Sequence, residues 1–291
     1  MWRNSALKLN YPPNFVPLVR LGGNAAALLR YTTRNNPKPH SWTMASRVKR
    51  VSIEGNIAVG KSTFARLLQS ACPDWEVVPE PVAKWQNIQS GNDFELGSEC
   101  TVNNLLQMMY ANPQRWSYTF QTHSCMSRMR TQLQPPNPRF LQTQGSTVQL
   151  YERSIYSDRY IFALNSFELG SINSTEWTIY QDWHTLLVQE FGNRVALEGI
   201  IYLQAPPQTC MERLKIRARP EEQAVQQDYL DKLHAQHERW LVHFEPLRRA
   251  PVLLLDASVE FKTDLQVQQD YISKVHLHGS TKIAKTHLRL N

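Results

Sequence analysis

Eight consecutive residues, from Gly55 to Ser62, have the types and spacing that hold the phosphates of a nucleotide in many proteins. They follow the pattern G-x-x-x-x-G-K-[ST] between a predicted strand and a predicted helix. The glycines let the backbone approach phosphate oxygens closely, and the helix N-terminus offers free N–H groups. We expect Lys61 to neutralise phosphate charge and the Ser62 hydroxyl to suit Mg²⁺. The phosphate-binding residues predicted here are Gly55, Asn56, Ile57, Ala58, Val59, Gly60, Lys61, Ser62 and Thr63.

Two carboxylates come at the ends of other predicted strands, where ligands bind in open α/β sheets. Glu80 ends "WEVVPE" and suits a neutral hydroxyl acceptor, because it can take the hydroxyl proton during attack on a γ-phosphoryl group. A nucleoside monophosphate acceptor is anionic and would favour arginine there. Glu152 ends "VQLYE", and Arg153 beside it can serve phosphoryl transfer. Asp256 in "VLLLDAS" is the alternative metal-side acid, but we favour Glu152 because of its arginine neighbour.

Three arginines near the end of a predicted helix form a possible lid over the transferring phosphates. Arg213 and Arg217 are four residues apart and share one helix face, and Arg219 follows before a proline. Such a set can stabilise a transferring phosphoryl group in the manner of an arginine finger. A solvated basic helix face would have the same pattern, so both interpretations stay open.

The phosphate loop, the two carboxylates and the arginines all lie at the ends of predicted strands and helices, and buried strands alternate with helices along the chain. This alternation predicts a parallel sheet covered by helices on both faces, which is an α/β fold of the phosphate-loop kinase type with an arginine lid. The predicted strands are 47–54, 75–82, 148–154, 199–207 and 250–258. The predicted helices are 61–72, 105–133 with a break at Pro113, 177–191, 208–219 and 229–244. We expect loops at 86–104 and 134–147.

The charge of the chain is divided unevenly. The formal net charge is +7, but residues 1–50 contain nine Lys and Arg residues and no Asp or Glu. The rest contains 23 basic and 25 acidic residues, a balance of −2. A nucleic-acid-binding body would carry the basic excess on a folded face, so no nucleic-acid partner is expected. No membrane span is expected either, because no run approaches about 18 apolar residues.

Residues 1–46 form a basic leader like a mitochondrial transit peptide, with Arg, Lys and small residues and no acids. Pro12, Pro13 and Pro17 interrupt any long amphipathic helix in it. Because of the basic, acid-free composition of this leader, we expect a mitochondrial location. If translation starts at Met44, we expect a cytoplasmic or nuclear location.

Taken together, these pieces resemble the deoxyribonucleoside kinases, specifically the deoxycytidine kinase/deoxyguanosine kinase branch. The resemblance covers roughly residues 47 to 261. It rests on the stretches "SIEGNIAVGKSTF", "DWEVVPEPVAKWQNIQ", "MMYANPQRWSYTFQT", "YERSIYSDRYIF", "WTIYQDWH" and "IIYLQAPPQTC". It implies an enzyme that transfers a phosphoryl group from ATP, or from another nucleoside triphosphate, to the 5′-hydroxyl of a deoxynucleoside in nucleotide salvage, with Mg²⁺ as cofactor. It also implies a homodimer built through helices, with "WTIYQDWHTLLVQEF" as the candidate interface helix and a monomer as the alternative.

The resemblance also implies roles for individual residues. Glu80 resembles the base for the 5′-hydroxyl, but the family's base is sometimes assigned to the glutamate of "ERS", so Glu80, Glu152 and Arg153 are all candidate catalytic residues. Ser62 and Glu152 are the candidate metal ligands. The donor-side candidates are the lid arginines Arg213, Arg217 and Arg219 and the adenine-facing loop Val259, Glu260 and Phe261. Among the substrate-binding candidates, Tyr110 and Glu222 resemble the pair that holds the sugar 3′-hydroxyl. Trp85 and Phe162 resemble the pocket walls that sandwich the base. The full set of substrate-binding candidates is Trp85, Tyr110, Gln121, Ser124, Arg128, Asp158, Phe162 and Glu222.

Four of these residues concern the choice of base. The amide of Gln121 offers a donor and an acceptor for a base edge, and Arg128 projects to the same side two helical turns later. An Arg128–Asp158 pair would present fixed donors and acceptors. In the family this pair accompanies deoxycytidine and purine deoxynucleosides, whereas thymidine-type enzymes have an apolar residue in place of the arginine. We therefore expect poor thymidine phosphorylation, and the choice among deoxycytidine, deoxyguanosine and deoxyadenosine stays open, although Ser124 is more like the guanosine enzyme.

Two segments depart from the family pattern. Between Trp240 and Pro251 the chain is about two helical turns shorter. The segment 275–291 is expected to be a divergent tail without the family's closing amphipathic helix, after a kinase domain at 47–274. These departures keep a non-catalytic nucleotide-binding paralogue as the main alternative. A nucleoside monophosphate kinase is a second one, which Glu80 disfavours.

Overall fold

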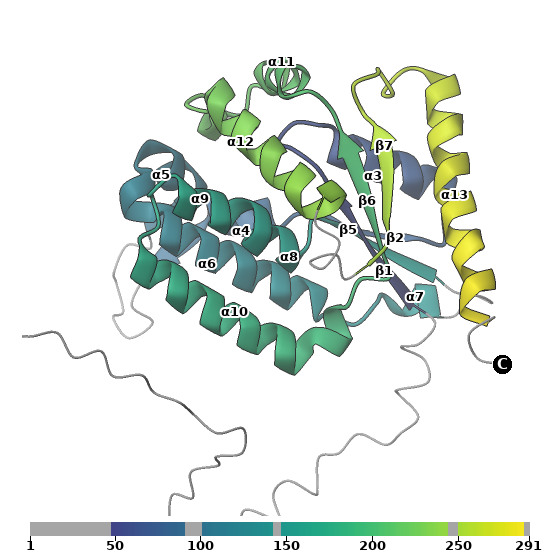
Figure 1. The fold of residues 1–291 in the computed structure, drawn as a ribbon, viewed down its shortest axis with the longest axis horizontal. Coiled ribbons are helices and arrows are strands. Elements are labelled where there is room, and N and C mark those ends of the chain that lie inside the picture. Colours follow the sequence, from purple (N-terminus) through teal and green to yellow (C-terminus); the bar gives the residue numbers. More distant parts are fainter. Residues whose placement is uncertain (1–47, 91–100, 142–146, 244–249, 288–291) are drawn as a thin grey trace, which may run out of the picture. The chain divides into compact units, whose positions relative to one another are not determined.

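The computed structural model describes residues 48–90, 101–141, 147–243 and 250–287, all within one compact unit that spans 44–291. At its centre is a parallel sheet with strand order β2-β5-β1-β6-β7 (Figure 1). The strands are β1 (Val48–Glu54), β2 (Glu76–Val78), β5 (Thr147–Glu152), β6 (Gly199–Gln204) and β7 (Val252–Asp256). The predicted α/β phosphate-loop kinase fold is confirmed.

The inner strands are apolar along most of their length because helices cover both faces of a parallel sheet. In β5 the first five residues are buried, and in β6 the four residues from Ile200 to Leu203 are buried. Strand β1 lies between them, with Ile53 paired to Glu152 on one side and to Ile201 on the other. This register brings the carboxyl ends of β1 and β5 together at one edge of the sheet, where the phosphate loop begins.

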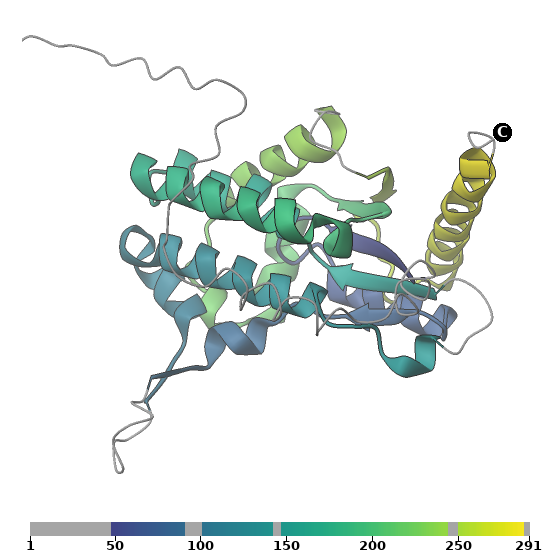
Figure 2. The same ribbon diagram turned by 90° about the horizontal axis from the view of Figure 1, so that it is seen from below.

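Helices lie on both faces of this sheet, as Figures 1 and 2 show from two directions. Helices α3 and α13 pack against each other and against the strands on one side, and α6, α10 and α12 lie on the other. The helices of the main domain are α3 (Lys61–Ala71), α5 (Leu105–Ala111), α6 (Pro113–Gln132), α10 (Ser174–Val195), α11 (Pro207–Arg217), α12 (Gln227–His237) and α13 (Leu265–His287). The shorter helices are α4 (Val82–Gln86), α7 (Pro138–Leu141), α8 (Ile155–Ser157), α9 (Leu164–Glu168), the 3₁₀ helix η3 (Pro220–Glu222) and the π-helices η2 (Asp158–Ala163) and η4 (Glu238–His243).

Local sequence signals set the ends of the longer helices. Pro113 is the first residue of α6, and the Asn112 side chain caps this helix by accepting a hydrogen bond from the Arg115 amide. Asn173 and Glu176 form a capping box at the start of α10. These caps fix where α6 and α10 begin, and α6 positions Gln121, Ser124 and Arg128 on one side of the site.

The structure corrects several predicted elements. The predicted loop 86–104 contains a small antiparallel hairpin of β3 (Ile88–Ser90) and β4 (Thr101–Asn103). The segment 155–168, for which no element was predicted, forms α8, η2 and α9. The expectation that the chain lacks a closing helix was wrong: α13 continues through 275 to His287, so the domain boundary placed at 274 falls inside a helix. Most of the shortened segment, 244–249, lies outside the described residues.

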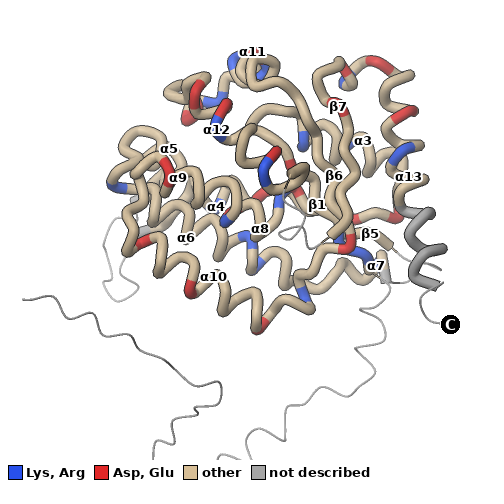
Figure 3. The backbone as a smooth tube through the Cα atoms, in the orientation of Figure 1, with Lys and Arg blue, Asp and Glu red and all other residues tan. Residues whose placement is uncertain are grey.

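Charged residues of both signs are interspersed over the described helices, as Figure 3 shows. This distribution agrees with the near-neutral balance expected for the chain after residue 50. Among the described residues, no helix combines the length and the hydropathy needed to cross a bilayer.

Candidate active site

The phosphate loop connects β1 to α3 through a strained turn. Gly60, which precedes α3, has a φ of 114°, a region that L-residues rarely adopt. A Cβ atom added to Gly60 would lie 2.6 Å from Cζ of Phe261. Glycine is therefore required at this position for two reasons, the backbone conformation and the close approach of the Phe261 ring.

Lys61 lies inside this loop and is almost completely buried. Its Nζ donates hydrogen bonds to the backbone oxygens of Asn56 at 2.8 Å and Gly55 at 3.3 Å. Burial, together with the positive charge of Arg153, lowers the pKa of Lys61 to about 7. The ammonium group is therefore held at the end of the loop, close to the point at which its charge becomes pH-dependent.

Ser62 and Glu152 meet at the carboxyl ends of β1 and β5. The Ser62 hydroxyl lies 2.8 Å from Oε1 and 3.0 Å from Oε2 of Glu152, so it donates to the carboxylate. A hydroxyl and a carboxylate are hard oxygen ligands of the kind that Mg²⁺ prefers. The predicted metal ligands thus fit the ion in chemistry and in proximity. By contrast, Asp256 is exposed, and its Oδ1 accepts hydrogen bonds from the amide and the hydroxyl of Ser258.

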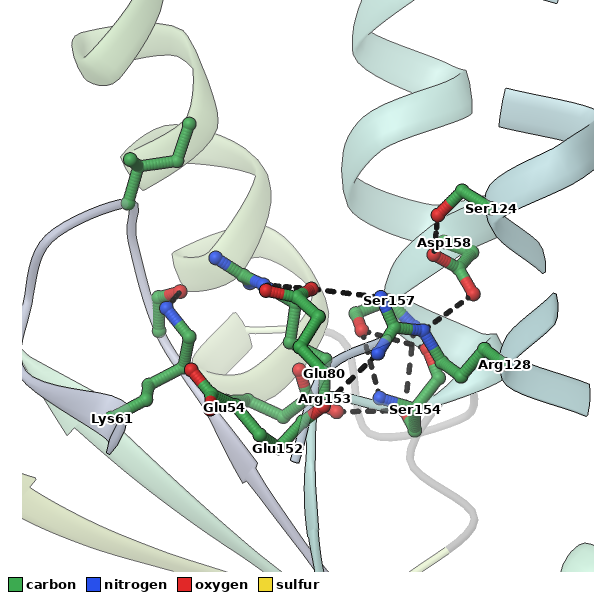
Figure 4. Close-up of polar contacts among 12 residues, drawn as sticks. Glu54, Lys61, Glu80, Ser124, Arg128, Glu152, Arg153, Ser154, Ser157 and Asp158 are labelled. Carbon is green, nitrogen blue, oxygen red and sulfur yellow. Dashed lines mark hydrogen bonds and ion pairs between the residues drawn. The ribbon is translucent and has the colours of Figure 1, made fainter. Parts of the chain in front are cut away.

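A buried ion network lies beside the phosphate loop, as the dashed lines in Figure 4 show. Oε1 of Glu80 accepts from Nη2 of Arg128 at 2.8 Å and lies 3.3 Å from Nε of Arg153. Nε of Arg128 donates to Oδ2 of Asp158 at 2.9 Å. Arg128 also donates from Nη1 to the backbone oxygen of Glu152 at 3.0 Å. Arg128 therefore joins the ends of β2 and β5 to η2.

The environment shifts the pKa values of the two carboxylates of this network in opposite directions. Burial favours protonation of Glu80, but the positive charges of Arg128, Arg153 and Lys61 outweigh it and lower the pKa of Glu80. Burial raises the pKa of Asp158 despite the charge and hydrogen bond of Arg128. Glu80 is thus the carboxylate that the site keeps ionised.

These groups line one pocket of about 270 Å³. It brings together most of the predicted site residues: Ile57, Ala58, Lys61, Ser62, Glu80, Trp85, Tyr110, Gln121, Ser124, Arg128, Glu152, Arg153, Asp158, Phe162, Arg217, Arg219 and Glu222. Ser124 donates to Oδ1 of Asp158 at 3.3 Å, and the guanidinium of Arg153 lies 4.5 Å from the ring centre of Phe162. Residues from strand ends, α4, α5, α6, η2 and η3 therefore converge on one cavity.

One end of this pocket combines an acid with two lid arginines. Glu222 is buried in η3 and forms ion pairs with Arg217 and with Arg219, the latter at 3.1 Å. Tyr110 lines the same pocket from α5. The structure thus places Arg217 and Arg219 on the pocket lining, where both pair with Glu222.

Arg213 has different neighbours from the other two predicted lid arginines and is not among the pocket-lining residues. Its guanidinium donates to four backbone oxygens, those of Ala257 at 2.7 Å, Val59 at 3.0 Å, Val259 at 3.1 Å and Ser258 at 3.5 Å. Val259, Glu260 and Phe261 also lie outside the pocket lining. Arg213 therefore connects the phosphate loop to the loop after β7, whereas the pattern of the sequence suggested a group that closes over phosphates.

Several pocket residues were not found from the sequence: Pro79, Val82, Leu106, Met109, Phe120 and Tyr229. Most of them are apolar, and nothing in their local pattern separates a pocket wall from a core position. Tyr229 enters from α12, and burial raises its pKa to about 12. Glu54, the last residue of β1, is an acid that lies outside the pocket lining. It is fully buried and accepts from the Ser154 hydroxyl at 2.7 Å.

The fold and the site define a class of protein. A phosphate loop at a helix N-terminus faces an ionised carboxylate and arginines across one cavity, which is the arrangement of an α/β phosphotransferase that uses a nucleotide. A family model described as deoxynucleoside kinase matches residues 51–278. The chain therefore belongs to the deoxynucleoside kinase family.

Curated relatives agree with this assignment. The chain is 54% identical over 225 residues to "Deoxyguanosine kinase, mitochondrial" of Xenopus laevis, which covers 75% of this chain and 84% of the relative. It is 51% identical over 235 residues to "Deoxycytidine kinase 2" of Gallus gallus, covering 78% and 88%. It is 50% identical over 238 residues to "Deoxycytidine kinase" of Homo sapiens, covering 79% and 91%. The predicted deoxycytidine kinase/deoxyguanosine kinase branch, and with it an ATP-dependent deoxynucleoside kinase, is confirmed.

Proposed function

We propose that this enzyme transfers the γ-phosphoryl group of ATP to the 5′-hydroxyl of deoxycytidine or a purine deoxynucleoside, with Glu80 as the base. The observation that carries the proposal is the position of Glu80. Its carboxylate lies between the phosphate-loop lysine and the Arg128–Asp158 pair, and its pKa is lowered. A base there stays ionised and reaches both the donor and the acceptor ends of the cavity.

The reaction needs a proton acceptor and charge stabilisation. As the 5′-oxygen forms its bond to the γ-phosphorus, its proton passes to Glu80, and the bond to the leaving ADP oxygen breaks. Lys61 and Arg153 stabilise the negative charge on the phosphoryl oxygens, with Arg217 and Arg219 from the lid side. Mg²⁺, held by Ser62 and Glu152, would neutralise charge on the β- and γ-phosphates.

The acceptor side supports deoxycytidine and purines over thymidine. Gln121 and the Arg128–Asp158 pair present donors and acceptors to a base edge, while Trp85 and Phe162 provide aromatic surfaces for stacking. The 5-methyl group of thymine would lie near a buried charged pair, which is costly to desolvate or displace. Both deoxycytidine and deoxyguanosine kinases are among the relatives, so either base is compatible with the branch.

A single assay tests the proposal. The enzyme is incubated with ATP and, separately, deoxycytidine, deoxyguanosine, deoxyadenosine, thymidine and dCMP, and the phosphorylated product is quantified. We expect turnover of at least one of the first three and little with thymidine. ATP binding without any turnover would favour a non-catalytic paralogue, and a preference for dCMP would favour a monophosphate kinase.

We further propose that the enzyme is a homodimer that associates through α10. Ile179 and Leu186 are seven residues apart on this helix, and they are 50% and 55% exposed. Light scattering should therefore give twice the chain mass, and the double variant Ile179→Glu/Leu186→Glu should give a monomer. Ile216→Glu, at an aliphatic residue 83% exposed on α11, is the matched control. A monomeric parent protein would contradict the proposal.

The basic leader supports a mitochondrial location. One of the relatives is a mitochondrial enzyme, and residues 1–46 of this chain carry basic and small residues without acids. The full chain fused to a C-terminal fluorescent protein should co-localise with mitochondria, whereas a product starting at Met44 should not. Diffuse fluorescence of the full fusion would favour the cytoplasm or nucleus.

A further inference from the structure

Glu221 joins three segments that are distant in the sequence. Its side chain is 9% exposed, and Oε1 accepts hydrogen bonds from Nε2 of Gln86 at 2.7 Å and Nδ2 of Asn104 at 2.8 Å. Gln86 is the last residue of α4, and Asn104 caps α5 by accepting from the Gln107 amide at 2.9 Å. One carboxylate oxygen therefore connects η3 to the end of α4 and to the start of α5. We call these two hydrogen bonds, from Gln86 and from Asn104 to Glu221, the tie.

The two amides flank the β3–β4 hairpin. Ile88 of β3 pairs with Asn103 of β4, so Gln86 and Asn104 lie just before and just after the paired strands. Oε2 of Glu221 has no hydrogen-bond partner among the described residues. The pKa of Glu221 is lowered, because the hydrogen bonds from Asn104 and Gln86 outweigh the effect of burial. The ionised form of Glu221 is therefore the one that holds both ends of the hairpin.

Each partner in this tie lies next to a pocket residue. Gln86 follows Trp85, Asn104 begins the helix that carries Tyr110, and Glu221 precedes Glu222. Glu222 itself has different partners and pairs with Arg217 and Arg219. The tie therefore fixes the spacing between the backbone that carries Glu222 and the two helices that carry Tyr110 and Trp85.

We propose that Glu221 is a positioning residue for the acceptor nucleoside: its hydrogen bonds to Gln86 and Asn104 align Tyr110 with Glu222 around the sugar 3′-hydroxyl. This inference rests on the proposed function and takes Tyr110 and Glu222, which line the same pocket, as the pair that binds that hydroxyl. The tie includes no residue of the phosphate loop, and Arg217 and Arg219 pair with Glu222 rather than with Glu221, so we expect its loss to act mainly on acceptor binding.

The test compares a deoxynucleoside with its 2′,3′-dideoxy analogue. In the parent enzyme, loss of the 3′-hydroxyl should lower kcat/KM strongly, because a site built to bind a hydroxyl rejects an analogue without it. In Glu221→Ala this discrimination should fall about tenfold, the ratio expected for losing a hydrogen bond to a charged group. The KM for the deoxynucleoside should rise and the KM for ATP should stay the same. Glu221→Gln keeps an acceptor oxygen and should retain most of the discrimination.

A second set of variants tests the tie without deleting a side chain. Asn104→Asp retains the helix-capping oxygen of α5 but replaces the donor to Glu221 with a second carboxylate. It should reproduce the loss of discrimination seen in Glu221→Ala. Adding Glu221→Gln to Asn104→Asp restores a donor–acceptor pair and should recover it, so the two changes should be strongly non-additive.

The outcomes separate this inference from the proposed function. If the parent enzyme phosphorylates no deoxynucleoside, or accepts both sugars equally, the proposed role of the Tyr110–Glu222 end fails. If the parent discriminates and Glu221→Ala discriminates equally well, the positioning role of Glu221 is wrong. An equal rise of KM for ATP and nucleoside would show a general loss of structure and would also overturn it. Melting temperatures of all variants identify that last case.

Discussion

The donor and acceptor ends of the cavity are built in different ways. The donor end is shaped mainly by its backbone. Gly60 has a positive φ, and a backbone oxygen accepts a hydrogen bond from Lys61. An arginine binds the loop oxygens of Val59 and Ala257. At the acceptor end, side chains from β2, α6, β5 and η2 pair with one another through Glu80, Arg128 and Asp158. The phosphate loop at the donor end is continuous in sequence, whereas the acceptor end is assembled from separate elements.

Because the two ends are built differently, they should tolerate different kinds of mutation. The phosphates of any nucleoside triphosphate are alike, so a rigid backbone cradle with one lysine suffices for them. An acceptor must be selected by its base and activated at its hydroxyl, which requires charged groups of fixed direction in a cavity with little water. The acceptor end should therefore be the more sensitive to loss of a single charge, and the donor end to changes of backbone shape.

The largest effect should come from removing the base at the acceptor end. We expect Glu80→Gln to lower kcat by about 10³-fold, because general-base catalysis contributes on the order of 10²–10⁴-fold. ATP affinity, measured by calorimetry, should stay within about twofold, since the change is nearly isosteric. Glu76→Gln, a change in the preceding strand β2 and outside the pocket lining, is the control. Persistent turnover in Glu80→Gln would mean that Glu152 or another group accepts the proton.

The next largest effect should come from removing the central cation of the acceptor network. Arg128→Met leaves Glu80 and Asp158 without their shared partner and should cost about 3 kcal/mol, or roughly a hundredfold in kcat/KM for deoxycytidine or a purine. Because Arg128 helps to lower the pKa of Glu80, the acid limb of the pH–rate profile should move to higher pH. Thymidine should become a relatively better substrate.

The control for this variant is Arg159→Met, one residue past Asp158. Arg159 donates to Thr185 on α10 and is not among the pocket-lining residues. Its loss should leave the acid limb in place. An unshifted acid limb in Arg128→Met would contradict the proposed effect of Arg128 on Glu80.

A smaller effect should follow from changing the backbone of the donor end. Gly60→Ala places a Cβ 2.6 Å from Cζ of Phe261 at a φ of 114°, and strain of this kind costs about 1–3 kcal/mol. The KM for ATP should rise about tenfold or more, with little change in the KM for the nucleoside. Gly170→Ala is the matched control, because Gly170 also has a positive φ, of 74°, but nothing lies within 4 Å of its added Cβ. Similar kinetics in both variants would exclude a specific role for the Gly60–Phe261 contact.

The smallest expected effect is a pH dependence of donor binding. Burial lowers the pKa of Lys61 to about 7, so the free enzyme loses this charge as the pH rises above 7. Triphosphate binding favours the ammonium form, so the complex must take up a proton, and ATP affinity should fall about fivefold between pH 7 and pH 8. Calorimetry in two buffers of different ionisation enthalpy measures the proton uptake. Lys61→Arg stays charged and should remove the dependence, and a parent enzyme without proton uptake would contradict it.

The donor end could be predicted from the sequence more completely than the acceptor end. The phosphate loop was identified completely, because its function depends on a local backbone shape encoded by eight consecutive residues. The residues around Arg128 and Asp158 were found only with a family resemblance, since their spacing along the chain shows no proximity. The pocket position of Tyr229 and the tie at Glu221 had no local signal, because α12 and η3 reach the site through tertiary packing alone.

Periodicity and glycine spacing in the sequence determined the parallel sheet, the phosphate loop and the positions of Glu80 and Glu152 at strand ends. These features depend on short-range backbone and burial preferences, which neighbouring residues specify directly. Tertiary structure alone decided that Arg213 binds loop carbonyls and that Glu221 connects η3 to both ends of the hairpin. A long polar side chain can reach many partners, and only the packing of distant elements selects one.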